Sequence, residues 1–137
     1  MVHALQQVHS ILQPNGVLIN VYDLPTPQMI EVRLLENVER VGFLTDSENY
    51  EPTIAAFNAL AQVVADGYFN LEEQQDFSFN IYADYLKELQ DWLAEWWSTA
   101  IIPTRSLQRI EELMQDARPR TRIVLALRAR MIKLRVV

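Results

Sequence analysis

Two long runs of strand-forming residues constrain the fold of this chain more than any other feature. The run from Phe69 to Tyr82 alternates apolar with polar side chains, and its polar side includes acids. The run from Arg120 to Val137 is rich in Ile, Val and Leu, with arginines in between, so we expect a final long strand that pairs antiparallel with the first run. The residues expected to face one another are Arg122, Arg128 and Arg130 on the last strand and Glu72 and Asp76 on the other.

We expect an irregularity in each of these strands. Glu73 and Gln75 interrupt the apolar side of the first run, which predicts a bulge or a break into two strands. The alternation of the last run slips near Met131, which predicts a bend at that point.

The expected pairing also explains an uneven distribution of charge. Residues 118–137 hold seven of the 12 basic side chains, Arg118 among them, and no acid, although the whole chain has a net charge of -6. A basic segment of this kind is also typical of phosphate-binding proteins, so nucleic-acid binding is the alternative. Since acids lie across the expected ladder, we interpret the arginines as structural and expect no nucleic-acid partner.

Apolar spacing and turn residues predict the elements of the first third of the chain. A helix from Val2 to Leu12 precedes a largely apolar strand from Gly16 to Leu24, which we expect to be covered on both faces. Two β-prone runs, Ile30 to Leu35 and Val38 to Leu44, predict a hairpin. Asn37 suits its turn, since Asn tolerates a positive φ.

Three further helices are expected. The first spans Pro52 to Asp66, the second begins after a capping Asp84, and the third begins at Pro103-Thr104 and ends before Pro119. The oxygens expected to cap the first of these helices belong to Asp46, Ser47 and Asn49. Together the elements predict one mixed α/β (α+β) domain, residues 1–137, with a largely antiparallel sheet of about five strands and four helices.

Composition and missing motifs exclude several classes of function. The chain has no cysteine, which excludes disulfides, thiolate nucleophiles and sulfur-ligated zinc and fits a reducing, cytoplasmic location. It has no membrane-spanning run and no signal peptide. We find no phosphate-binding loop, nucleophile elbow or metal-binding motif, and His3 and His9 are wrongly spaced on their helix to bind one metal together. We therefore expect no catalytic, cofactor-binding or metal-binding residue.

Two short segments are candidates for binding a substrate. Trp92 and Trp96 share one helical face in the most aromatic part of the chain, and the alternative is that they belong to a core or a subunit interface. Tyr22 and Asp23 lie at the carboxyl end of the predicted apolar strand, where open α/β sheets bind ligands, and the alternative is an ordinary strand end.

The first helix, its turn and the next strand show a recognisable order of residue types: Ala4-Leu5, Val8-His9, Ile11-Leu12, Pro14, Gly16 and then the apolar Val17 to Tyr22. This order resembles class I S-adenosylmethionine-dependent methyltransferases, in which a helix, a Leu-Lys-Pro-Gly-Gly-like turn and the fifth sheet strand follow one another. The chain departs from that motif at Gln13 and Asn15, where the family usually has Lys and Gly.

The resemblance implies the C-terminal half of such a fold. The helix at 52–66, a sixth strand at 69–82 and a last strand at 120–137 would follow, with the last strand inserted antiparallel between its two predecessors. The hairpin at 30–44 and the helices at 84–117 would be insertions. We find neither the Gly-rich turn nor the acidic strand end that hold the cofactor in this family, so the resemblance implies no S-adenosylmethionine site unless a partner chain supplies it.

The same resemblance implies an open sheet edge along Val17 to Tyr22. An uncovered apolar edge is normally paired or shielded, so we expect a homodimer or a separate cofactor-binding chain as partner. The resulting hypothesis is a non-catalytic, methyltransferase-like module with an oligomerising or accessory role. One alternative is a subunit of a split methyltransferase whose substrate wall is formed by Tyr22, Asp23, Trp92 and Trp96. Another is a small-molecule binding module that uses the aromatic cluster.

Overall fold

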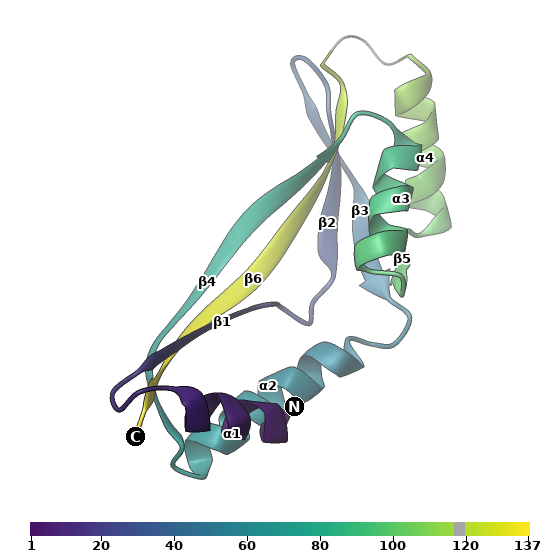
Figure 1. Ribbon diagram of the computed structural model, residues 1–137. Coiled ribbons are helices and arrows are strands. Elements are labelled where there is room, and N and C mark those ends of the chain that lie inside the picture. Colours follow the sequence, from purple (N-terminus) through teal and green to yellow (C-terminus); the bar gives the residue numbers. More distant parts are fainter. Residues whose placement is uncertain (117–119) are drawn as a thin grey trace. The chain divides into compact units, whose positions relative to one another are not determined.

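The computed structural model describes residues 1–116 and 120–137 (Figure 1). Within them it contains four helices and six strands, and the pairings of known register are antiparallel, which confirms the predicted fold class. The elements are α1 (Val2–Ile11), β1 (Val17–Asp23), β2 (Gln28–Arg33), β3 (Val38–Asp46), α2 (Glu51–Ala65), β4 (Phe69–Ala83), α3 (Leu86–Trp96), β5 (Ala100–Ile101), α4 (Thr104–Gln115) and β6 (Arg122–Val136).

Most of these elements match the expected ranges. Strand β5 was not predicted, because two residues are too short to form a pattern. Arg118, counted in the basic segment, and Pro119, expected to follow the last helix, lie outside the described residues. No described helix combines the length and the apolar character that crossing a membrane would require.

The chain divides into two compact units. Unit 1 consists of Met1–Pro25, Tyr50–Phe77 and Arg128–Val137, and unit 2 consists of Thr26–Asn49 and Ser78–Leu127. Strands β4 and β6 contribute residues to both units. The expectation of one domain stays a prediction.

In unit 1, β6 lies between β1 and β4 and is antiparallel to β1. Helices α1 and α2 lie side by side and pack against these strands (Figure 1). The ring of His9 meets the rings of Tyr68 and Phe69 edge-on at 5.2 and 5.4 Å, so this histidine packs against aromatic residues of the unit. The buried core residues of the unit are Leu5, Ala59, Leu60, Val63, Phe69, Ile132, Leu134 and Val136.

Unit 2 contains the predicted hairpin. Strand β2 pairs with β3 on one side and with the first part of β6 on the other, and helices α3 and α4 complete the core. The turn is closed by a 2.7 Å hydrogen bond from the Leu34 N–H to the Asn37 carbonyl. Asn37 does not have a positive φ, so the predicted role of that conformation in the turn is wrong.

Strand β1 differs from the prediction in its burial. We expected both faces to be covered, but exposed and half-buried residues alternate along the strand. Leu18 and Tyr22 pack against the core of unit 1, whereas Val17, Ile19 and Val21 are exposed. The sequence pattern failed here because an apolar run shows which side chains favour burial, not whether the chain supplies a second covering layer.

Strand β6 supplies alternate residues to the two cores. Its odd-numbered Ile123 and Leu125 are buried in unit 2, and its even-numbered Ile132 and Leu134 are buried in unit 1. The change occurs where Arg130 and Met131 are both half-buried. The buried positions thus change where the sequence alternation slips, while the predicted bend near Met131 stays a prediction.

The expected ion pairs between β4 and β6 are present with partly different partners. Arg130 binds Asp76 through two hydrogen bonds of 2.6 and 3.0 Å, as predicted. Glu72 binds Lys133 and Arg135 instead of an even-numbered arginine. Strand β4 runs unbroken from Phe69 to Ala83, so the predicted break into two strands is wrong, and the alternative, a bulge at Glu73 and Gln75, stays a prediction.

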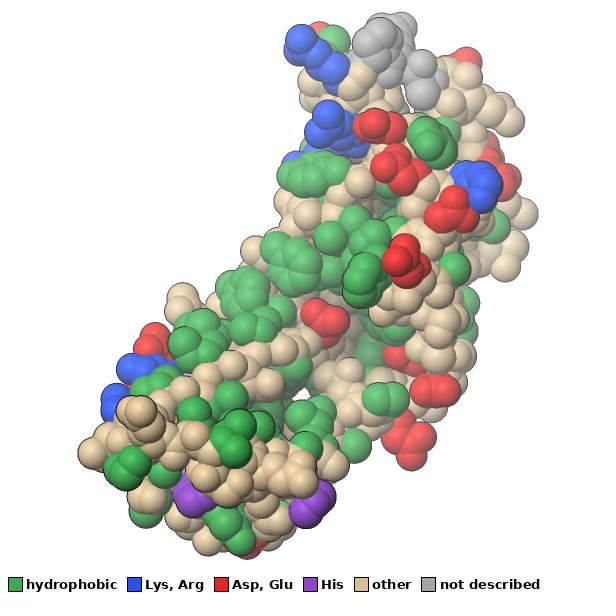
Figure 2. Space-filling model, viewed as in Figure 1, with side chains coloured by type: hydrophobic (Ala, Val, Ile, Leu, Met, Phe, Trp, Pro, Cys, Tyr) green, Lys and Arg blue, Asp and Glu red, His purple; other side chains and the backbone are tan. Residues whose placement is uncertain are grey.

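Apolar side chains along β4 are exposed (Figure 2). Only the terminal Phe69 and Ala83 of this strand are buried. Leu71, Phe77 and Phe79 retain between 38% and 50% of their accessible surface. The alternation that predicted the strand therefore does not correspond to a buried face.

The predicted helix caps are wrong. Helix α2 begins after Tyr50, which has a φ of 61° and makes no side-chain cap. Asp46 instead accepts hydrogen bonds of 2.8 Å from the Glu48 N–H and from the Trp97 indole N–H. Helix α3 begins after Tyr85 rather than at Asp84, again without a side-chain cap from the first residue.

Candidate functional site

Strand β1 has one free edge. In an antiparallel ladder, alternate residues exchange hydrogen bonds with the partner strand, and the residues between them direct their backbone groups away from it. The Val136 N–H donates to the Gly16 carbonyl and the Leu24 N–H donates to the Arg128 carbonyl, both at 2.9 Å. Even-numbered residues of β1 therefore bond to β6. The backbone groups directed to the other edge belong to Val17, Ile19, Val21 and Asp23.

No strand in the described part of the chain pairs with that edge. The side chains of Ile19 and Val21 are also more than half exposed, at 59% and 56%. Proteins usually protect such an edge with charged residues, Pro or a bulge, but β1 carries a single charge, at Asp23. The free edge of β1, Val17–Asp23, is thus a surface that favours strand pairing.

An apolar groove lies in unit 1 beside α2. Its volume is about 360 Å³. Exposed Phe57 forms part of its wall, and its ring meets the Tyr22 ring edge-on at 6.0 Å. The residues that line the groove are Tyr22, Phe57, Leu60, Ala61, Val64, Ala65, Leu71, Gln74, Ile132 and Leu134.

Tyr22, a predicted binding residue, therefore lines a real groove. Burial raises the pKa of its hydroxyl above 10.0, and the Arg130 guanidinium acts in the opposite direction. Arg130 also lies over the Phe57 ring at 6.0 Å, and its charge is balanced by Asp76. Removal from water raises the pKa of the Asp23 carboxyl above 3.8.

The predicted tryptophans belong to the other unit. Trp92 and Trp96 are both in α3 of unit 2, where Trp92 is half-buried against the core and Trp96 is 70% exposed. Trp92 thus has the packing role weighed as the alternative. Whether Tyr22, Asp23 and the tryptophans bind a substrate stays a prediction.

The groove contains residues that sequence reasoning missed as site residues. Phe57, Leu60 and Val64 form an apolar stripe at helical spacing, which predicts the helix at 52–66 but not a groove beside it. In the structure Leu60 is buried, while Phe57 remains 39% exposed beside the groove. Helical periodicity identifies the stripe but cannot distinguish a covered part from an open one.

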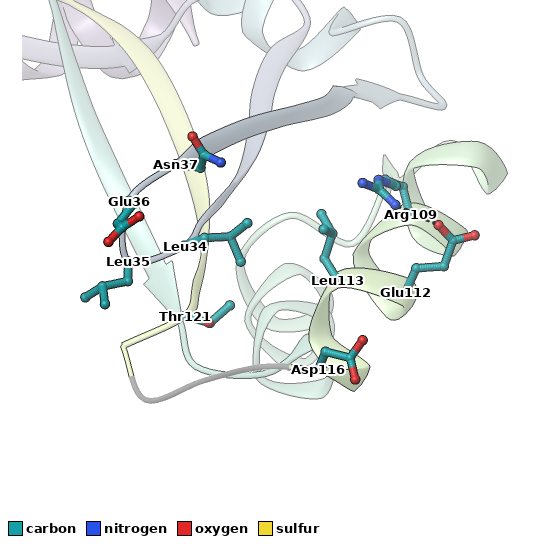
Figure 3. A pocket seen from close by; sticks show the side chains of 9 residues that line it. All are labelled: Leu34, Leu35, Glu36, Asn37, Arg109, Glu112, Leu113, Asp116 and Thr121. Carbon is teal, nitrogen blue, oxygen red and sulfur yellow. Dashed lines mark hydrogen bonds and ion pairs between the residues drawn. The ribbon is translucent and has the colours of Figure 1, made fainter.

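A second pocket of about 440 Å³ lies in unit 2, between the hairpin turn and α4 (Figure 3). Leu34 and Leu113 point toward one another across it. Its cation, Arg109, is held by Glu39 through hydrogen bonds of 2.6 and 2.8 Å and by Glu112 at 2.9 Å. These carboxylates raise the pKa of Arg109. They also neutralise its positive charge, so the guanidinium does not offer an anion-binding site.

The groove of unit 1 does not fit S-adenosylmethionine. This molecule carries a nucleoside, a sulfonium and an amino acid group, which need several polar partners. Among the lining residues only Tyr22 and Gln74 carry polar side-chain groups, and the nearby Arg130 and Asp76 bind each other. We therefore assign no cofactor to the groove. The described residues also contain no cluster of three or more acids or histidines able to hold a metal ion.

Comparisons with protein-family models, with curated proteins and with solved structures found no match to this chain. The candidate sites of unit 1 are the free edge of β1 and the apolar groove beside α2.

Proposed function

We propose that this chain is a methyltransferase-like accessory module that has no catalytic activity of its own and associates with another chain through the free edge of β1. The proposal combines the sequence resemblance with the architecture of unit 1. The free edge supplies the means of association, and the resemblance supplies the kind of fold.

The division of the chain into units is the observation that carries this proposal. The elements that resemble a methyltransferase, α1, β1, α2, the first part of β4 and the last part of β6, all belong to unit 1. The two predicted insertions, the hairpin and the α3–α4 region, belong to unit 2. An insertion that forms its own compact unit leaves the parent fold recognisable.

The strand order in unit 1 gives further support. The last strand, β6, lies between β1 and β4 and runs antiparallel to β1. The family that the sequence resembles places its last strand in the same way, between the two strands that precede it. Within that arrangement β1 has a neighbour on one side only.

Association through the edge of β1 can be tested with a proline substitution. The Ile19 N–H points away from β6, so Ile19→Pro removes an edge donor without removing a ladder hydrogen bond. We expect light scattering to show an assembly for the native chain at micromolar concentration and a monomer for Ile19→Pro. Ile19→Thr, which keeps the N–H and loses apolar surface, is the matched control and should weaken assembly less.

Circular dichroism establishes that each variant is folded, and Val21→Pro provides a second edge variant should Ile19→Pro fail to fold. A native chain that is monomeric at micromolar concentration contradicts the proposal. So does an assembly that both proline variants leave intact.

The proposal requires that the isolated chain does not bind S-adenosylmethionine, and calorimetry tests this binding. The isolated chain should give no heat of binding, and a measurable heat would contradict the proposal. The position of Tyr22 and Asp23, the last two residues of β1, favours a second candidate, the subunit of a split methyltransferase, because open α/β sheets bind ligands at the carboxyl ends of their strands. Under that candidate, heat of binding appears only after a cofactor-binding chain is added.

A further inference from the structure

We infer that the partner of β1 is β1 of a second copy of this chain, and that the two strands pair antiparallel about a two-fold axis through Asn20. The inference rests on the proposed function, because it names the chain that occupies the free edge. It would join the two copies of unit 1 into one continuous sheet.

Hydrogen-bond geometry restricts how two copies can pair. The even-numbered backbone groups of β1 are bound to β6, so only odd-numbered residues can form the new hydrogen-bonded pairs. Every register that places an odd-numbered residue opposite an even-numbered residue of the second copy is therefore excluded. Of the remaining registers, the one centred on Asn20 overlaps all seven residues of the strand, and any shift leaves residues at both ends unpaired.

The side chains are self-complementary in this register. Ile19 lies opposite Val21 of the second copy, which gives a β-branched pair on the exposed face, and these pairs stabilise sheets. Asn20 lies opposite Asn20 of the second copy, where the two side-chain amides can exchange a hydrogen bond. Asp23 lies opposite Val17, so the two carboxylates stay at opposite ends of the joined strands.

Charge separates this edge from the other outer strand of unit 1. Strand β4 carries three acids, and Glu73 among them forms no ion pair in the described residues, so pairing two copies of β4 would bring like charges together. Strand β1 carries no Lys, Pro or Gly and only the terminal Asp23. A second copy therefore meets electrostatic repulsion at β4 and almost none at β1.

Covalent trapping tests the register directly, and the chain lacks cysteine, so introduced thiols have no native background. In the centred register the two Asn20 residues form a non-hydrogen-bonded pair, whose Cα atoms lie about 4.5 Å apart. That separation lies within the range of a disulfide, about 4.4 to 6.8 Å.

The experiment compares four single variants under mild oxidation: Asn20→Cys, Ile19→Cys, Val21→Cys and, as the measure of random collision, Leu35→Cys in the exposed hairpin turn of unit 2. We expect Asn20→Cys to form the covalent dimer at least about tenfold faster than the other three, because only residue 20 faces its own copy directly. A mixture of Ile19→Cys and Val21→Cys should cross-link faster than either protein alone.

The other outcomes overturn the inference in distinguishable ways. If Ile19→Cys or Val21→Cys reacts fastest, the register is wrong, although association through β1 stands. If all three β1 variants react at the rate of Leu35→Cys while light scattering shows an assembly that Ile19→Pro abolishes, β1 pairs with something other than a second β1. If the native chain is monomeric, both this inference and the proposed function fail.

Discussion

Gly42 sits at the bulge of strand β3, with a φ of 147° that residues with side chains rarely adopt. The pairing with β2 shifts register there, since Ile30 pairs with Gly42 and Glu31 pairs with Arg40. A Cβ at Gly42 would collide with the buried Ser106 hydroxyl, which donates a 2.8 Å hydrogen bond to the Val41 carbonyl. We expect Gly42→Ala to lower the free energy of unfolding by about 1 to 3 kcal/mol, measured by urea denaturation.

Gly67 is the control for this prediction. Its φ is also positive, at 80°, but a Cβ there meets no atom within 4 Å. Gly67→Ala should therefore cost only the backbone strain, about 1 kcal/mol. Equal losses for the two variants would show that the collision with Ser106 contributes nothing.

Glu72 should make stability depend on pH. Hydrogen bonds from Arg135 and Lys133 lower its pKa from 4.5 to about 2. Because the folded-state pKa lies below the unfolded value, this contribution to stability is complete above pH 4.5 and is lost as the pH falls toward about 2. We expect Glu72→Gln to reduce the fall in thermal midpoint over that range.

Asp76 acts in the same direction, since Arg130 lowers its pKa below 3.8, so Glu72→Gln should flatten the pH dependence only in part. Glu73→Gln is the control, because Glu73 forms no ion pair among the described residues. A Glu73→Gln variant that flattens the curve as much as Glu72→Gln would refute the assignment.

At the scale of the element, the start of helix α3 shows how a helix can be predicted correctly while its cap is not. Sequence spacing predicts a helix through Leu86, Leu89 and Leu93 that begins after Asp84, and the helix is present but begins at Leu86. The expected cap from Asp84 is wrong: the Glu88 carboxylate instead accepts a 2.8 Å hydrogen bond from the Asp84 N–H. Helical periodicity shows which face of a helix is apolar. It does not show which of several nearby side-chain oxygens accepts a hydrogen bond from a backbone N–H at the helix start.

Glu88 should therefore contribute to the stability of this helix. We expect Glu88→Ala to lower the free energy of unfolding by about 0.5 to 1.5 kcal/mol, through loss of this hydrogen bond, in urea denaturation. Glu95→Ala, in the last turn of the same helix, tests the effect of losing an acid without a cap and should cost less. A larger loss of stability for Glu95→Ala than for Glu88→Ala would contradict the capping role of Glu88.

At the scale of the whole molecule, the question is whether the two units unfold together. Leu134 is fully buried in the core of unit 1 and Leu125 in that of unit 2, so replacing either by Ala should cost about 2 to 5 kcal/mol. Since β4 and β6 run through both units, we expect both variants to shift one shared transition.

The tryptophans make this prediction measurable. All three tryptophans, Trp92, Trp96 and Trp97, lie in unit 2, so their fluorescence reports that unit, while circular dichroism reports the whole chain. For Leu134→Ala both signals should shift to the same lower urea concentration. A fluorescence transition that Leu134→Ala leaves unchanged would show that the units unfold independently and that residues 1–137 are not one cooperative domain.

The sequence by itself determined the four helices, every strand except β5, and part of the strand pairing. Apolar spacing predicts all four helices, and alternation with opposite charge predicts the β4–β6 pair and its Arg130–Asp76 ion pair. These are properties of neighbouring residues along one element or across one ladder, which a linear pattern contains.

Only the tertiary structure decided which apolar surfaces are covered. The run at Val17–Asp23 predicts a strand, but the pattern cannot state that one face and one edge stay open. The same holds for Phe57, which belongs to a helical stripe yet borders an open groove. Burial depends on which other elements the folded chain brings within contact distance, and these elements lie far away in the sequence.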